Sequence, residues 1–133
     1  MNVPMLQPNE RKALQVFIHQ LQDIYSNQIL QTILYGSKAR GDSTPDSDID
    51  VLIILNQEDL QTRNQILTIA SRVSLDHDVL LNPVIVGEAR YKRQQGFTFY
   101  QNAVRDAIQL SLQRERLILV PGIPGEFGQV TAH

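Results

Sequence analysis

The segment 48–55, Asp-Ile-Asp-Val-Leu-Ile-Ile-Leu, constrains the fold more than any other stretch of this chain. It has the residue types of a β-strand, and its second half is apolar on both faces. Strands of that kind are typical of sheets that are covered by other elements. The 133 residues suffice for one domain with a substantial core. We therefore expect an α/β or α+β domain, in which helices flank a small mixed β-sheet.

The other elements are predicted from hydrophobic spacing and from the positions of Gly and Pro. Helical spacing predicts helices over 9–25, 58–75 and 88–110, the last one divided at Gly96. Strands are predicted over 29–35, 48–55, 79–86 and 117–120, with a helical turn over 38–40. Pro83 predicts that the third strand lies near an edge or bulge. We expect a single domain over 1–120 and a mobile tail over 121–133, where Pro and Gly alternate closely.

Composition excludes several classes of protein. The absence of Cys excludes disulfide scaffolds, Cys-ligated zinc, iron–sulfur clusters and thiol catalysis, and it fits a reducing compartment. The longest apolar run, 51–55, is far short of the roughly 20 residues that span a bilayer. The first residues show no signal-peptide pattern, so we expect a cytoplasmic protein without a membrane partner. The net charge of −2 argues against direct binding to nucleic acid.

Charge is distributed unevenly along the chain. Residues 42–59 carry a net charge of −6, whereas residues 90–116 carry +4. This contrast is consistent with a cation site and an anionic partner, but charge alone favours the simpler interpretation of two solvated faces. The aromatic residues in 90–116 recur at helical spacing, which favours a place in the core.

The segment after the first strand has the features of a phosphate site. Gly36 permits a tight turn and a close approach of a ligand to the backbone. Ser37 opens a helical turn whose free N–H groups suit phosphate. Lys38 and Arg40 add positive charge nearby, so these four residues are the predicted nucleotide-binding set. For Arg40, a salt bridge that holds the following loop is an equally good interpretation.

Two carboxylates follow at the start of the next predicted strand. Asp48 and Asp50 are two residues apart, so both side chains project from the same face. Carboxylates this close repel each other unless a cation lies between them, and Mg²⁺ prefers carboxylate and phosphate oxygens. A phosphate-binding turn opposite a carboxylate pair predicts a metal-dependent nucleotidyl-transfer site.

The sequence Gly36-Ser37, ten residues, then Asp48-x-Asp50 resembles the signature of the DNA polymerase β-type nucleotidyltransferases. The fuller string Gly-Ser-x-Ala-Arg-Gly resembles the minimal nucleotidyltransferases (MNT), which pair with HEPT-domain toxins. The resemblance implies a sheet with flanking helices and transfer of AMP from ATP with two Mg²⁺ ions. It also implies that the acceptor is a tyrosine hydroxyl of a HEPT-type toxin. The protein would then be an antitoxin that forms a hetero-oligomer and neutralises its partner by adenylylation (AMPylation).

The resemblance also implies a third catalytic carboxylate on a following strand. Asp78 borders the predicted strand 79–86, so we expect it to bind metal and to act as the general base. Asp76 is the alternative, and His77 would point to the opposite face.

Two other functions compete with the antitoxin interpretation. One is a nucleotidyltransferase that modifies a small molecule, as antibiotic-modifying relatives do, although those usually carry an additional helical domain. The other is a non-catalytic antitoxin that inhibits its partner by binding alone.

Overall fold

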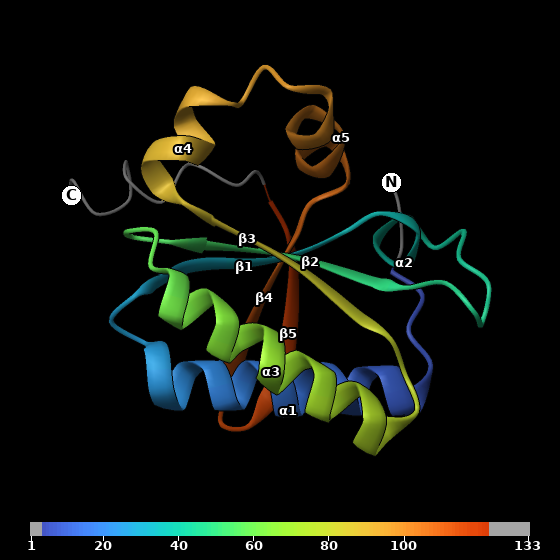
Figure 1. The fold of residues 1–133 in the computed structure, drawn as a ribbon. Helices are drawn as coiled ribbons and strands as arrows, with labels where there is room; N and C mark the ends of the chain where they lie inside the picture. Colours follow the sequence, from blue (N-terminus) through green and yellow to red (C-terminus); the bar gives the residue numbers. More distant parts are fainter. Residues whose placement is uncertain (1–3, 123–133) are drawn as a thin grey trace.

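The computed structural model describes residues 4–122 and shows a mixed α/β domain (Figure 1). This part of the chain contains five helices and five strands. In chain order they are α1 (Pro8–Tyr25), β1 (Ile29–Tyr35), α2 (Ser37–Arg40), β2 (Ile49–Leu55), α3 (Leu60–His77), β3 (Leu81–Gly87), α4 (Glu88–Arg93), α5 (Thr98–Asp106), β4 (Ile108–Gln113) and β5 (Arg116–Pro121). The first six of these agree with the sequence predictions to within about two residues.

The strands form one mixed sheet in the order β3-β2-β1-β4-β5. β2 and β3 run parallel, and all the other neighbours are antiparallel. The sheet with its flanking helices confirms the predicted fold class. β3 lies at one edge of the sheet, as Pro83 predicts, because proline has no N–H group to donate to a second neighbouring strand.

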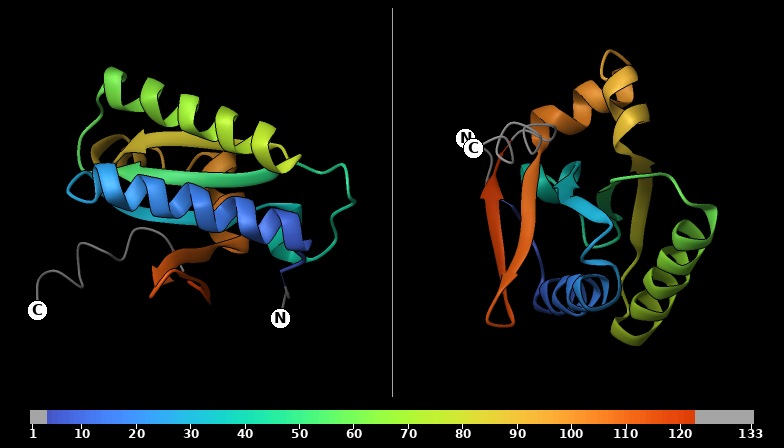
Figure 2. Two further views of the ribbon diagram at one scale, coloured as in Figure 1. Left: turned by 90° about the horizontal axis from the view of Figure 1, so that it is seen from below. Right: turned by 90° about the vertical axis from the view of Figure 1, so that its left-hand side faces the viewer.

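Helices cover both faces of the sheet, as Figures 1 and 2 show. α1 and α3 lie on one face, over the larger apolar core, and α4 and α5 lie on the other face. β2 contributes to both cores, which explains its unbroken apolar sequence. Its residues Ile49, Val51, Ile53 and Leu55 face the larger core, and Leu52 and Ile54 face the smaller one.

The predicted helix over 88–110 is wrong at its C-terminal end. The structure divides it into α4 and α5, as Gly96 suggests, but Ile108 begins β4. Here Ile108, Leu110 and Leu112 alternate with polar residues, which is the period of a strand. Arg114 and Glu115 then form the turn to β5, both with positive φ. The pairing of β4 with β1 and β5 therefore prevails over the helical spacing that precedes it.

The aromatic side chains of 90–116 fall into two groups. Tyr91 and Tyr100 are buried in the smaller core, as helical spacing predicts. Phe97 and Phe99 are 59% and 40% exposed, so the core interpretation is wrong for them. Phe97 precedes α5 rather than lying within it.

The ends of the predicted domain are only partly described. Pro121 ends β5, and the predicted tail beyond Gly122 lies outside the described residues. Within 4–122, no helix combines the length and apolar character needed to cross a bilayer.

A buried ion pair joins the start of α1 to α2. Lys38 Nζ lies 2.6 Å from Glu10 Oε2, and the two side chains are only 2% and 6% exposed. Glu10 Oε1 also accepts a hydrogen bond from the backbone N–H of Gln7 at 2.7 Å, and Lys38 Nζ donates to the carbonyl of Thr44 at 3.2 Å. This pair therefore connects α1, α2 and the loop that leads to β2.

Replacing Lys38 with Met tests this connection, because it leaves the Glu10 carboxylate buried without its cation. We expect the free energy of unfolding to fall by about 3–5 kcal/mol in urea denaturation. The double variant Lys38→Met with Glu10→Gln should recover most of that loss. The control is Lys92→Met, since Lys92 forms an exposed pair with Glu88 and should change stability by less than about 1 kcal/mol. Additive losses in the double variant would show that the two residues do not depend on each other.

Candidate functional site

The candidate site forms where β1 ends beside the start of β2. Tyr35, the last residue of β1, is the register partner of Asp50 in β2. Directly opposite residues of antiparallel strands present their side chains to the same face, so Tyr35 and Asp50 lie side by side. This is the face that α4 and α5 partly cover. The pKa of Tyr35 is raised by burial and by the nearby Asp50 and Tyr100, which keeps its phenol protonated.

Gly36 brings the backbone after β1 against the carboxylate of Asp50. Its φ of 76° and ψ of −155° lie in a region that residues with a side chain rarely adopt. A Cβ atom on Gly36 would lie 2.5 Å from Asp50 Oδ2. Both the backbone conformation and the close approach therefore require glycine at this position. The turn continues into α2, where the N–H of Arg40 donates to the Gly36 carbonyl at 3.0 Å.

Asp50 has a hydrogen-bond partner on the neighbouring strand β3. β2 and β3 place Asp50 opposite Asn82, and Asn82 Nδ2 donates a hydrogen bond of 3.0 Å to Asp50 Oδ1. Burial raises the pKa of Asp50, and the charge of Asp48 raises it further. The Asn82 hydrogen bond and the charge of Arg40 oppose this rise. A positive charge at the carboxylate pair would therefore relieve a real electrostatic cost.

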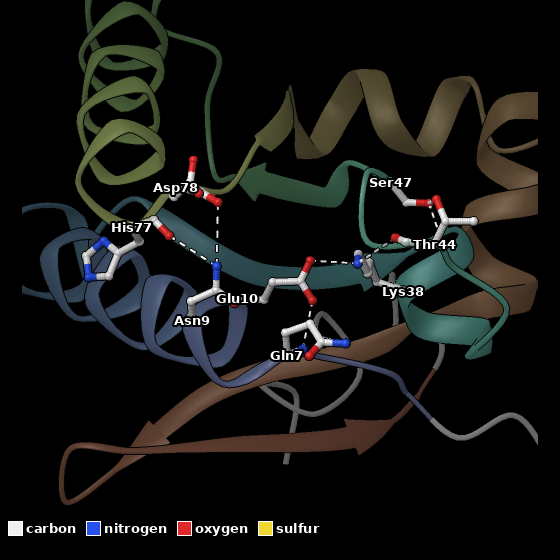
Figure 3. Close-up of polar contacts among 8 residues, drawn as sticks. All are labelled: Gln7, Asn9, Glu10, Lys38, Thr44, Ser47, His77 and Asp78. Carbon is white, nitrogen blue, oxygen red and sulfur yellow. Dashed lines mark hydrogen bonds and ion pairs between the residues drawn. The ribbon is translucent and has the colours of Figure 1, made fainter.

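Lys38 does not take part in the candidate site. The prediction placed it with the nucleotide-binding residues, but its ammonium is buried between Glu10 and the carbonyl of Thr44 (Figure 3). Thr44 in turn bonds to Ser47, whose Oγ accepts from the Thr44 N–H at 3.0 Å. Lys38 thus positions the loop that leads to Asp48, and its charge is neutralised inside the fold.

Arg40 lies at the edge of the site and is held by two carboxylates. Its Nε lies 3.1 Å from Asp42 Oδ2, and its Nη1 lies 2.8 Å from Asp106 Oδ2 at the end of α5. These hydrogen bonds raise the pKa of Arg40. The salt-bridge interpretation of Arg40 is therefore confirmed, and the same guanidinium still acts on the charge of Asp50.

Asp78 does not lie beside the carboxylate pair. It ends α3 with a φ of 55° and precedes the start of β3 by three residues. The residue opposite Asp50 is Asn82, four residues after Asp78. Asn9 donates to the backbone carbonyls of His77 and Asp78, which holds this end of α3 against α1 (Figure 3). The structure thus does not pair Asp78 with Asp50 across the sheet, and Asp76 is further away along the chain, in the last turn of α3.

The sequence interpretation missed Asn82 and Asp106. Asn82 is the one polar residue within the predicted strand 79–86, and that signal could have identified it as a partner for Asp50. Asp106 could not be connected with Arg40 from the sequence, because 66 residues separate them.

The donor set at the site fits a divalent cation with substrate ligands. Asp48 and Asp50 offer two carboxylates near enough for the charge of one to act on the other, and Mg²⁺ is usually held by one or two carboxylates together with phosphates and water. Among residues 4–122, no group of three or more His, Cys, Asp or Glu side chains could hold a metal ion on its own. A bound metal would therefore complete its shell with water or with oxygens from a nucleotide.

Comparison with known families agrees with this geometry. The family described as "Polymerase beta, Nucleotidyltransferase" matches residues 19–113, which include β1, β2, β3 and β4. The match covers more than half of the chain, so the chain belongs to this family of nucleotidyltransferases and is a nucleotidyltransferase enzyme.

Two curated relatives come from Methanocaldococcus jannaschii. "Putative protein adenylyltransferase MJ0604" is 30% identical over 98 residues, which are 74% of this chain and 94% of the relative. "Putative protein adenylyltransferase MJ0141" is 38% identical over 75 residues, which are 56% of this chain and 76% of the relative. Among solved structures, "a putative nucleotidyltransferase from Sulfolobus solfataricus" superimposes with a TM-score of 0.51 at 18% identity. The alignment covers 82% of this chain and 86% of the solved chain, and this likeness supports the fold.

Gly36→Ala tests the contact between the turn and the carboxylate. The new Cβ should strain the backbone and displace Asp50, so we expect stability to fall by about 1–3 kcal/mol and cation binding at Asp48 and Asp50 to weaken. Guanidinium denaturation and Mn²⁺ titration measure the two effects. Gly96→Ala is the matched control, because a Cβ there meets no atom within 4 Å. Equal behaviour of the two variants would contradict this account of Gly36.

Proposed function

We propose that this nucleotidyltransferase is a protein adenylyltransferase that neutralises a cognate HEPT-type toxin in the cytoplasm. In this proposal it transfers AMP from ATP to a tyrosine hydroxyl of the toxin, with which it forms a hetero-oligomer. The observation that carries the proposal is the close contact between Gly36 and the Asp50 carboxylate. That contact brings the Gly36 turn, the expected phosphate site, directly against one of the two carboxylates. The names of the curated relatives support a protein as the acceptor.

Each residue of the site has a distinct role in this proposal. Gly36 and Ser37 receive the phosphates at the turn, where the absence of a Cβ lets the triphosphate approach the backbone. Asp48 and Asp50 would hold Mg²⁺. When bound, this ion would neutralise the phosphate charge that otherwise faces the two carboxylates. Arg40, fixed by Asp42 and Asp106, contributes positive charge at the border of the site.

The transfer is a single displacement at phosphorus. The tyrosine oxygen of the acceptor forms a bond to the α-phosphorus of ATP, and the bond between that phosphorus and the bridging oxygen to the β-phosphate breaks. Pyrophosphate leaves with the electron pair, and the phenolic proton passes to water. Asp78 has no place in this step, because it lies at the end of α3.

Asp50→Asn is the sharpest test of the proposal. The change removes the negative charge but keeps the size of the side chain, so the fold should persist. We expect the rate of AMP transfer to fall by more than about 100-fold, since metal and charge stabilisation at such sites contributes several kcal/mol. The assay combines the purified protein, Mg²⁺, a candidate HEPT-type partner and ATP labelled at the α-phosphate, with the label on the partner as the readout.

Asp78→Asn is the matched control, because Asp78 is exposed and asparagine tolerates its left-handed conformation. It should transfer AMP at the normal rate. Undiminished transfer by Asp50→Asn would overturn the proposed mechanism. Label on a small molecule instead of the protein would favour a small-molecule nucleotidyltransferase, and a tight complex without label would favour inhibition by binding alone.

A further inference from the structure

The position beside Asp50 on the neighbouring strand is occupied by an amide. β2 and β3 are parallel and pair Asp50 with Asn82 in register, and the two side chains are joined by a 3.0 Å hydrogen bond. A carboxylate oxygen can only accept, so the amide of Asn82 must donate. Asn82 therefore provides a partial positive charge at a point where a carboxylate would add a full negative one.

This arrangement affects both the orientation and the charge of the site. The hydrogen bond fixes Asp50 Oδ1 on the side of β3, while Asp50 Oδ2 faces Gly36. Partners that hold a metal-binding carboxylate in this way usually contribute substantially to metal affinity. The same amide leaves only Asp48 and Asp50 as anionic ligands, and two carboxylates compensate the charge of one divalent cation.

We propose that the site binds one divalent cation and that Asn82 is the positioning residue that fixes Asp50 for it. The inference rests on the proposed role of Asp48 and Asp50 as metal ligands, and it departs from the two ions that the family resemblance implies. A second ion would need a further anionic ligand beside Asp50, and the strand position that could supply it carries Asn82. Asn82 thus determines the number of cations as well as the orientation of the carboxylate.

The test measures binding of Mn²⁺ alone to the whole chain, by the loss of the electron paramagnetic resonance signal of the free ion. Mn²⁺ prefers the same oxygen ligands as Mg²⁺. The wild-type protein should saturate at one Mn²⁺ per chain. Asn82→Ala should weaken binding about 10-fold, because Asp50 loses its hydrogen bond. Asn82→Asp should tighten binding about 10-fold, because a third carboxylate then lies beside Asp50.

Opposite effects of the two variants separate a role at the cation from a role in folding, since damage to the fold would weaken binding in both. Asn64→Asp is the control for charge, because it adds the same charge at an exposed position on α3. It should bind Mn²⁺ like the wild type. Saturation of the wild type at two ions, or no binding at all, would overturn the inference, as would unchanged affinity in Asn82→Asp. Neither ATP nor a toxin is present, so loss of AMP transfer to a HEPT-type partner, tested separately, would leave this result intact.

Discussion

The contact between Gly36 and the carboxylate of Asp50 is the constraint on which the site depends. It exists because β1 and β2 are antiparallel neighbours, so the end of one strand meets the beginning of the other. The ten residues between Ser37 and Asp48 only have to return the chain over this short distance. The carboxylate pair then lies beside the turn, where Lys38 holds the connecting loop and Asn82 holds the Asp50 side chain.

The charged residues around this contact divide into two kinds that the sequence does not distinguish. Lys38 and Arg40 are two residues apart in the same short helix, yet Lys38 is buried against Glu10, whereas Arg40 reaches the border of the site. Acidic partners hold both side chains, and besides Asp42 these partners come from α1 and α5, on opposite faces of the sheet. The short helix α2 is therefore fixed from both faces, which keeps the Gly36 turn in place although only four residues form the helix.

The fold was largely predictable because the apolar residues of its strands indicate which strands are buried. The continuous apolar run in β2 indicates a covered sheet, and Pro83 indicates the edge position of β3. The start of β4 was missed because Ile108 satisfies a helical spacing with Val104 as well as a strand spacing with Leu110. At the site, Asp48, Asp50 and Gly36 were predictable from local chemistry. Asn82 and Asp106 were not identified, because their contacts depend on strand register and on the packing of α5.

The unequal size of the two cores has a consequence for how the molecule moves. The face under α4 and α5 buries fewer than half as many hydrophobic residues as the face under α1 and α3. The ion pair between Arg90 and Glu58 connects α4 to the segment that precedes α3. Layers with less buried apolar surface open at a lower free energy than the rest of a domain. The backbone amides of α5 should therefore exchange with solvent through a local opening, while those of β2 exchange only when the whole domain unfolds. Because Asp50 and Tyr35 lie on the same face as that layer, the approach to the site is governed by the less stable of the two helical layers.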